Sequence, residues 1–320
     1  MTPTPWRTVP LTDDYGLPGR RPPGATDPTA YLRTVEVLGA DVHHLDLPGP
    51  TPDAPVVLLV HGLGGRWQHW AENLAGLAEH ARVVALDLPG FGRSSPPRGG
   101  YAVDGFADVV AALARELALP PLTVVGHSLG ALVALRLAHR HPDLVSSVVL
   151  AGGTVGAFAE VLGLRRAGHQ LRHRPRTVAA TLLEVMTAGL PVPGLVRRQV
   201  VARAWLRRLL LWPYLHRPAD MPATGIAALV DGVGTHGVLR IARSVATMRV
   251  DRWLHEVDHP VLAIGGERDH VAPLDQLAAF ARAVPSAETV VLAGVGHMVM
   301  LECADAFTDE VLAFLQQPRS

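Results

Sequence analysis

The sequence has 320 residues, with 29 basic and 29 acidic side chains and a formal net charge of zero. A chain of this length can bury a large core and carry an insertion, so we expect one compact unit rather than several independent domains. The balanced charge gives no reason to expect nucleic acid as a partner. The single cysteine, Cys303, excludes an internal disulfide, fits a reducing compartment, and is predicted to be packed in a terminal helix.

The amino-terminal residues are polar and rich in proline, and they lack the apolar run of a secretory signal. No stretch reaches the ~20 uninterrupted apolar residues that span a membrane. We therefore expect a soluble, cytoplasmic protein. Nothing in the sequence specifies its oligomeric state.

The chain is predicted to begin with an irregular extension over residues 1–29, where Pro and Gly are too frequent for a helix or a central strand. Two strand-like runs follow, and their spacing predicts a hairpin. An alternation of short apolar strands with helices begins at Pro55, which predicts right-handed crossovers and a mostly parallel sheet. The predicted strands are Tyr31–Leu38, Asp41–Leu47, Pro55–Val60, Arg82–Leu86, Leu122–Val125 and Ser147–Leu150, and the predicted helices are Arg66–Glu79, Val103–Leu119 and Ala131–His141.

The alternation stops over residues 155–250, where the pattern is helical without a clear strand. We therefore predict an α/β core formed by residues 30–154 and 251–320, with residues 155–250 inserted as a helical cap. The elements predicted after the cap are strands at Pro260–Ile264 and Thr289–Leu292 and helices at Leu274–Val284 and Asp305–Leu315.

The cap contains 14 Arg and only four acidic residues, a formal charge of +10. We interpret this charge as solvated helix faces, with a preference for anionic or interfacial substrates as the alternative. Within the cap, the run Trp205–Leu215 is apolar and aromatic with a basic edge. Packing of the cap over the core explains this run most simply, and contact with a membrane surface is the alternative.

The segment Gly126-His-Ser-Leu-Gly130 matches the pattern G-x-S-x-G directly after a predicted strand and directly before a predicted helix. That context makes a short pattern specific for a nucleophilic serine. A serine on such a sharp turn has a strained backbone, and Gly126 and Gly130 relieve crowding on either side. The hydroxyl of Ser128 would then project from the sheet edge. An ordinary turn flanked by glycines is the alternative.

A serine hydroxyl needs a base to become a good nucleophile. His297 is the candidate, because it lies on a glycine-rich loop after the last predicted strand. The base in turn needs a carboxylate on its other ring nitrogen. Asp269 also follows a strand and is the predicted partner, with Glu267 and Asp275 as alternatives. The chain order of Ser128, Asp269 and His297 is the one expected for a sheet with a G-x-S-x-G turn.

The oxyanion that forms during acyl transfer needs preorganised donors. The loop His61-Gly-Leu-Gly-Gly65 follows a predicted strand, and we assign the donors to the backbone N–H groups of Leu63 and Leu129. His61 and Gly62 are predicted to be structural, because this loop must hold a tight shape. His127, beside the candidate nucleophile, is predicted to be packed rather than reactive.

These motifs resemble those of the α/β-hydrolase-fold family over about residues 30–154 and 251–317. Asp87–Ser94 looks like the loop after that family's fourth strand, and Pro260–Asp269 looks like its strand-to-acid segment. The resemblance implies an eight-stranded sheet, a helical cap after strand six, and acyl-enzyme chemistry. We expect this chemistry to require no metal or organic cofactor. Subfamilies with an aspartate nucleophile are similar in outline, but Ser128 argues against them.

One pattern suggests a metal. His255-Glu-Val-Asp-His259 fits the H-E-x-x-H motif of zinc proteases, which requires both histidines on one face of a continuing helix. Pro260 follows at once and moves His259 out of helical geometry, so we predict no metal site. His43 and His44 would point to opposite faces of a strand and could not chelate as a pair.

We therefore expect hydrolysis of a carboxylic ester, or a related acyl compound, of small to medium size and largely hydrophobic character. The same triad could catalyse C–C bond hydrolysis, amide cleavage, perhydrolysis or cofactor-free oxygenation, because this fold hosts many chemistries. Outside catalysis, the alternative is a small-ligand sensor with weak turnover. Steady hydrolysis of a simple ester would favour the enzyme, and stabilisation by a ligand without turnover would favour the sensor.

Overall fold

The computed structural model describes residues 4–22, 27–153, 172–189, 192–232 and 237–317. Their strands form one sheet in the order β1-β9-β8-β7-β6-β4-β5-β3-β2. All neighbouring strands are parallel except β3, which is antiparallel to both β2 and β5. The predicted fold class, a mostly parallel sheet with helices on both faces, is confirmed. The strands are Arg7–Val9 (β1), Leu32–Val37 (β2), Ala40–Leu47 (β3), Val56–Val60 (β4), Arg82–Leu86 (β5), Leu122–His127 (β6), Val145–Ala151 (β7), Val261–Gly266 (β8) and Glu288–Leu292 (β9).

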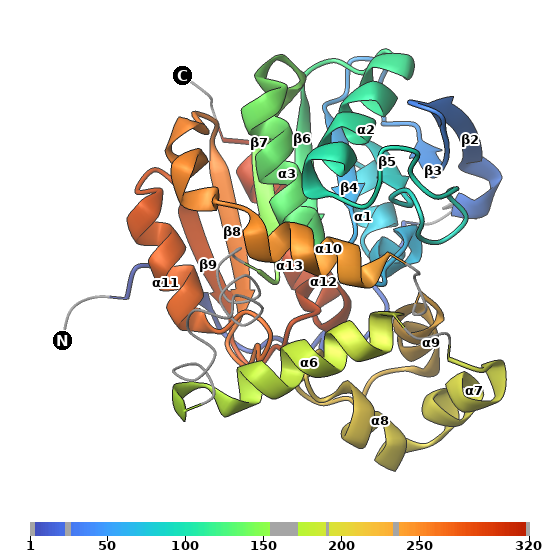
Figure 1. Cartoon of the computed structure of the whole chain (residues 1–320), viewed down its shortest axis with the longest axis vertical. Helices are drawn as coiled ribbons and strands as arrows, with labels where there is room; N and C mark the ends of the chain where they lie inside the picture. Colours follow the sequence, from blue (N-terminus) through green and yellow to red (C-terminus); the bar gives the residue numbers. More distant parts are fainter. Residues whose placement is uncertain (1–3, 23–26, 154–171, 190–191, 233–236, 318–320) are drawn as a thin grey trace.

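The central strands are buried on both faces, which is why their sequences are almost wholly apolar. In β4, Leu58 and Val60 belong to one hydrophobic cluster and Val57 and Leu59 to the other, because side chains alternate along a strand. The helices α2 (Val103–Glu116), α3 (Leu129–Arg140) and α11 (Leu274–Ala283) contribute to the first cluster, and α1 (Leu74–Ala78), α12 (Val299–Glu302) and α13 (Ala304–Leu315) contribute to the second (Figure 1).

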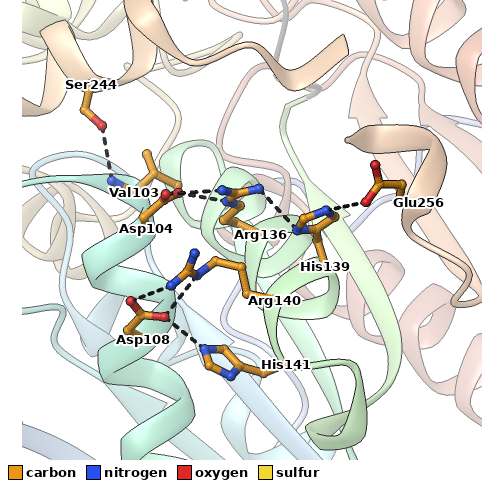
Figure 2. Close-up of polar contacts among 9 residues, drawn as sticks. All are labelled: Val103, Asp104, Asp108, Arg136, His139, Arg140, His141, Ser244 and Glu256. Carbon is orange, nitrogen blue, oxygen red and sulfur yellow. Dashed lines mark hydrogen bonds and ion pairs between the residues drawn. The ribbon is translucent and has the colours of Figure 1, made fainter. Parts of the chain in front are cut away.

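Polar contacts join α2 to α3 and to a helix from the cap region (Figure 2). Arg136 Nε in α3 donates to Asp104 Oδ1 in α2 at 2.8 Å. The backbone N–H of Val103, at the first position of α2, donates to Ser244 Oγ of α10 (Val238–Thr247) at 3.3 Å. The first N–H groups of a helix have no partner inside it, so Ser244 satisfies one of them and holds α10 against the core.

The amino-terminal extension differs from the expectation. Arg7–Val9 forms the edge strand β1, which pairs in parallel with β9, so the described sheet has nine strands rather than the predicted eight. An edge strand this short needs only a few backbone hydrogen bonds, and Pro10 directly after it removes a donor where none is needed. The prediction that residues 1–29 are irregular, which rested on their Pro and Gly content, is therefore wrong for Arg7–Val9. The predicted hairpin of β2 and β3 is confirmed.

The stretch Arg66–Glu79, predicted as one helix, is interrupted. It forms a 3₁₀ turn at Trp67–Trp70 and the short helix α1 at Leu74–Ala78. The backbone N–H of Trp67 donates to Asp87 Oδ1 at 2.8 Å, and the buried Asn73 amide donates to the carbonyl of Ala304 at 3.1 Å. Tertiary contacts at these two points outweigh the local helical pattern.

Helices occupy the chain between β7 and β8. They are α6 (Pro175–Gly189), α7 (Gly194–Ala202), α8 (Ala204–Leu211), α9 (Ala223–Asp231) and α10. Figure 1 shows α6, α7, α8 and α9 together at one end of the sheet, whereas α10 runs across the core helices. The predicted start of the cap lies in residues 154–171, outside the described residues, so the boundaries of the cap remain a prediction.

The run Trp205–Leu215 packs only in part. Leu211 and Leu215 are buried in the second hydrophobic cluster, but Trp205 and Leu209 are 57% and 60% exposed. Across the described residues, the helices are too short or too polar to cross a bilayer.

Candidate active site

Ser128 lies on the turn between β6 and α3 with φ 52° and ψ −114°, a backbone conformation that a residue with a side chain rarely adopts. The surrounding packing holds this strained turn in place. A Cβ atom on Gly126 would lie 2.1 Å from the carbonyl oxygen of Gly130, and one on Gly130 would lie 2.2 Å from that of Val60. Gly126 is therefore required for the turn to close on the start of α3, and Gly130 for the turn to pack against β4.

His297 and Asp269 form a buried pair at the same end of the sheet. His297 Nδ1 lies 2.8 Å from Asp269 Oδ2, and Asp269 Oδ1 accepts the backbone N–H groups of Val271 and Ala272, each at 2.8 Å. A carboxylate fixed by three contacts holds the imidazole with its proton on Nδ1. Among the described residues, His297 Nε2 has no hydrogen-bond partner. Nε2 is therefore the nitrogen that is free to accept a proton.

The two alternative carboxylates have other partners. Glu267 Oε2 accepts the backbone N–H of Gly294 at 2.9 Å, and Asp275 forms an exposed ion pair with Arg174. The described contacts therefore pair His297 with Asp269 rather than with Glu267 or Asp275.

The charges around His297 favour its protonated form. Burial disfavours the imidazolium, but the negative charge and hydrogen bond of Asp269, with the charges of Glu184 and Glu302, outweigh it and raise the pKa of His297 above its ordinary value. The neighbouring His127 behaves in the opposite way, because burial lowers its pKa well below the ordinary range. His127 Nε2 donates to the carbonyl of His297 at 3.2 Å, as expected for a packed, neutral ring.

Ser128 and His297 line the same cavity, which has a volume of about 180 Å³. Most of its wall is apolar. The cap contributes Ala188, Val196, Val200, Leu211, Leu229 and Val230 to this wall. The arrangement brings together, at one end of the sheet, a strained serine, an apolar binding space and an imidazole nitrogen that has no partner among the described residues.

The loop after β4 lies beside the serine. Leu63 lines the cavity, and Leu129 directly follows Ser128 at the start of α3, so both predicted donors flank the serine. His61 Nδ1 donates to the carbonyl of Gly62 at 2.8 Å, and its Nε2 accepts the backbone N–H of Leu88 at 2.9 Å. Both nitrogens of His61 are occupied, and burial lowers its pKa, so its contacts are those of a structural residue.

The packing of this loop also explains Gly62. A Cβ atom there would lie 2.8 Å from His127 Nδ1 and 3.1 Å from the Cβ of Ser128. A side chain at Gly62 would therefore displace the ring of His127 and crowd Ser128.

Several polar residues around the site were not predicted from the sequence. Glu184 and Tyr214 come from the cap, His69 lies on the 3₁₀ turn, and all three line the cavity. Burial raises the pKa of Glu184 to about 7 and lowers that of His69 to about 3. No local motif marks these residues, since only the fold brings them to the cavity.

Glu302 is a fourth missed residue. Its Oε1 accepts the backbone N–H of Gly296 at 2.9 Å, and its Oε2 accepts the N–H of His216 at 2.8 Å and the hydroxyl of Tyr15 at 2.7 Å. It thereby joins the loop of His297 to the cap and to the amino-terminal segment. An acidic residue directly after the apolar run from residue 298 to 301 was the signal that could have revealed it.

The H-E-x-x-H segment does not form the helix that zinc proteases use. Leu254–Glu256 is a 3₁₀ turn, and His259 Nε2 donates instead to the carbonyl of Pro142 at 3.3 Å. His43 and His44 both lie on β3 and are both buried. Within the described ranges, no three or more His, Cys, Asp or Glu side chains are placed to hold a metal ion together.

Comparison with known proteins gives consistent matches. A family model described as alpha/beta hydrolase fold matches residues 55–190, and one described as TAP-like protein matches residues 242–320. The dihydrolipoyllysine-residue acetyltransferase component of the acetoin cleaving system of Cupriavidus necator is 33% identical, over 92% of this chain and 72% of that protein. The chain spans only 64% of the length of the Pseudomonas putida protein of the same description.

Two further proteins are similar over nearly their whole length. The putative carbamate hydrolase RutD of Agrobacterium fabrum is 28% identical, over 85% of this chain and 97% of that protein. A solved structure described as Est816, an N-acyl homoserine lactone degrading enzyme, superposes with a TM-score of 0.64 at 23% identity, covering 88% of this chain and all of that one. The similarity to the Est816 structure shows that the two proteins share a fold.

Proposed function

The chain belongs to the alpha/beta-hydrolase-fold family, and we propose that it is a serine hydrolase that cleaves carboxylic esters of small to medium hydrophobic acids. The observation that carries the proposal is the buried pair of His297 and Asp269, together with His297 Nε2, which has no partner among the described residues, in the cavity that Ser128 also lines. The relative from Agrobacterium fabrum is described as a putative carbamate hydrolase. A carbamate, like an ester, has a carbonyl carbon bonded to a heteroatom, so this description supports attack on such a carbon.

In the proposed mechanism, Ser128 Oγ attacks the ester carbonyl carbon while His297 Nε2 takes the hydroxyl proton. Asp269 holds the imidazole in the required tautomer and stabilises the imidazolium. The backbone N–H groups of Leu63 and Leu129 donate to the oxyanion. The C–O bond to the alcohol then breaks, and His297 gives its proton to the departing oxygen, leaving an acyl group on Ser128.

Water completes the reaction. His297 Nε2 removes a proton from the water as it attacks the acyl carbon, and then gives that proton to Ser128 Oγ as the second tetrahedral intermediate collapses to the free acid. All of these groups belong to the chain or to solvent. The cavity of about 180 Å³ and its apolar wall favour a small to medium hydrophobic acyl group.

The test is the initial rate of hydrolysis of p-nitrophenyl esters from acetate to decanoate by wild type and by Ser128→Ala. We expect turnover of the wild type with an optimum at a short or medium chain, and loss of turnover in the variant. The fold of the variant is checked by its circular dichroism and melting temperature. Hydrolysis that is retained in folded Ser128→Ala would refute the proposal, as would the absence of ester turnover by folded wild type.

A further inference from the structure

Glu184 is a buried carboxyl group in a mostly apolar cavity wall. It lies on α6, its side chain lines the cavity with Ser128 and His297, and it is 4% exposed. Among the described residues, its Oε2 atom has no hydrogen-bond partner. Burial of a carboxyl oxygen without a partner is costly, so such an oxygen on a side chain that lines a binding cavity points to a ligand that satisfies the carboxyl group.

Two other polar side chains of the cavity wall have partners of their own. Thr187 Oγ1, one turn along α6, donates to the carbonyl of Leu183 at 2.7 Å and lies 3.4 Å from the hydroxyl of Tyr214. Arg197, the arginine of the lining, pairs with Asp231 at 3.4 Å. Within the described residues, neither Thr187 nor Arg197 forms a hydrogen bond or ion pair with the carboxyl group of Glu184.

The chemistry of a carboxyl group defines the missing partner. An ionised carboxylate only accepts hydrogen bonds, and those bonds are charge-assisted and stronger than neutral ones. Burial raises the pKa of Glu184 to about 7, so a donor in the cavity would be met by a carboxylate that is readily ionised at neutral pH. A purely apolar substrate would cover Oε2 without satisfying it.

We propose that Glu184 is a specificity residue that accepts a hydrogen bond from a donor group, such as a hydroxyl, an amide N–H or an ammonium, on the substrate held in this cavity. The inference rests on the proposed esterase function and narrows its substrate class. The preferred ester is hydrophobic along most of its length and carries one hydrogen-bond donor away from the scissile bond.

The experiment compares p-nitrophenyl esters of matched length that differ at the chain end. Heptanoate has a methyl, 6-hydroxyhexanoate a hydroxyl, 6-aminohexanoate an ammonium, and 5-methoxypentanoate an ether acceptor without a donor. A shorter pair, 3-methylbutanoate and 3-hydroxybutanoate, covers a closer position. Acetate esters of 1-heptanol and 1,6-hexanediol, measured with a pH indicator, place the donor on the alcohol instead.

The readout is the ratio of kcat/KM for a donor ester to that for its methyl isostere. For at least one series, we expect a wild-type ratio that falls roughly 10- to 100-fold in Glu184→Leu, the range for a hydrogen bond to a charged group. Glu184→Gln keeps the shape and one acceptor, so it should retain part of the hydroxyl preference and lose any ammonium preference. Thr187→Val is the matched control from the same helix, and it should leave the ratio unchanged.

The outcomes separate this inference from the proposed function. A ratio that is the same in wild type, Glu184→Leu and Glu184→Gln for every series overturns the role of Glu184, even if all esters are cleaved. A preference for the ether over the hydroxyl also overturns it, because the carboxyl group would then be acting as a donor. If Glu184 acts only by raising the pKa of His297, its replacement changes kcat/KM by the same factor for a donor ester and for its methyl isostere. The ratio then stays constant, which also overturns the role of Glu184 in specificity. Failure of folded wild type to cleave any ester refutes the esterase proposal itself.

Discussion

His297 Nδ1 lies 2.8 Å from Asp269 Oδ2, and both side chains are almost fully buried. Because two backbone N–H groups hold the other oxygen of Asp269, the carboxylate cannot turn away without losing two further hydrogen bonds. The orientation of His297 therefore depends on Asp269, and so does the availability of its Nε2 atom to Ser128.

Asp269→Asn should reduce kcat by roughly 10³- to 10⁴-fold, because the amide can donate to Nδ1 and stabilise the wrong tautomer of His297. Steady-state kinetics on the best p-nitrophenyl ester measures the effect. Glu267→Gln is the matched control, since Glu267 contacts the backbone of Gly294 instead. A mild effect of Asp269→Asn together with a severe effect of Glu267→Gln or Asp275→Asn would show that the acid is misassigned.

The acid limb of the pH profile should lie at a raised pH. His297 must be neutral to act as base, so kcat/KM falls as pH drops through the pKa of His297, which its neighbours raise above the ordinary value. Glu184→Gln removes one of the negative charges that raise this pKa, so the limb should move to lower pH. A limb that stays in place or moves to higher pH in Glu184→Gln would contradict this electrostatic account.

Gly130→Ala should abolish activity and destabilise the fold, because its Cβ would lie 2.2 Å from the carbonyl oxygen of Val60. Overpacking of this kind costs about 1–3 kcal/mol or more. Gly99→Ala is the matched control, since no atom of the described residues lies within 4 Å of a Cβ there. Thermal melting and ester hydrolysis give both readouts. If Gly130→Ala behaves like Gly99→Ala, the turn does not depend on close packing against β4.

Glu302→Gln should lower both the free energy of unfolding and kcat. Oε2 of Glu302 accepts two hydrogen bonds and Oε1 accepts one. The NH₂ group of a glutamine would replace one of these oxygens, so it must face at least one N–H or O–H donor. A buried polar group without a partner costs about 1–3 kcal/mol. The control is Asp309→Asn. Asp309 forms an exposed ion pair with Arg20, and such a pair contributes about 0–1 kcal/mol to the free energy of unfolding. Urea unfolding of both variants measures the difference, and equal midpoints would argue against this role of Glu302.

The elements that were predicted from sequence are those with local signals. The parallel strands have apolar runs, and the turn at Ser128 has glycines at fixed positions, because close approach of Gly130 to Val60 allows no side chain. The strand β1 and the interruption of Arg66–Glu79 depend on pairing with β9 and on contacts with Asp87, which no local pattern records. Glu184 reaches the cavity only through packing of the cap, so its role required the structure.

The most direct test of the account is covalent labelling of the serine. Wild type and Ser128→Ala are incubated with a p-nitrophenyl alkylphosphonate, released p-nitrophenol is counted, and the adduct is located by mass spectrometry of peptides. We predict one equivalent of p-nitrophenol and one phosphonate on Ser128, with no adduct on the alanine variant. Labelling at another residue, equal labelling of both proteins, or no labelling of folded wild type would contradict the assignment of Ser128 as the nucleophile.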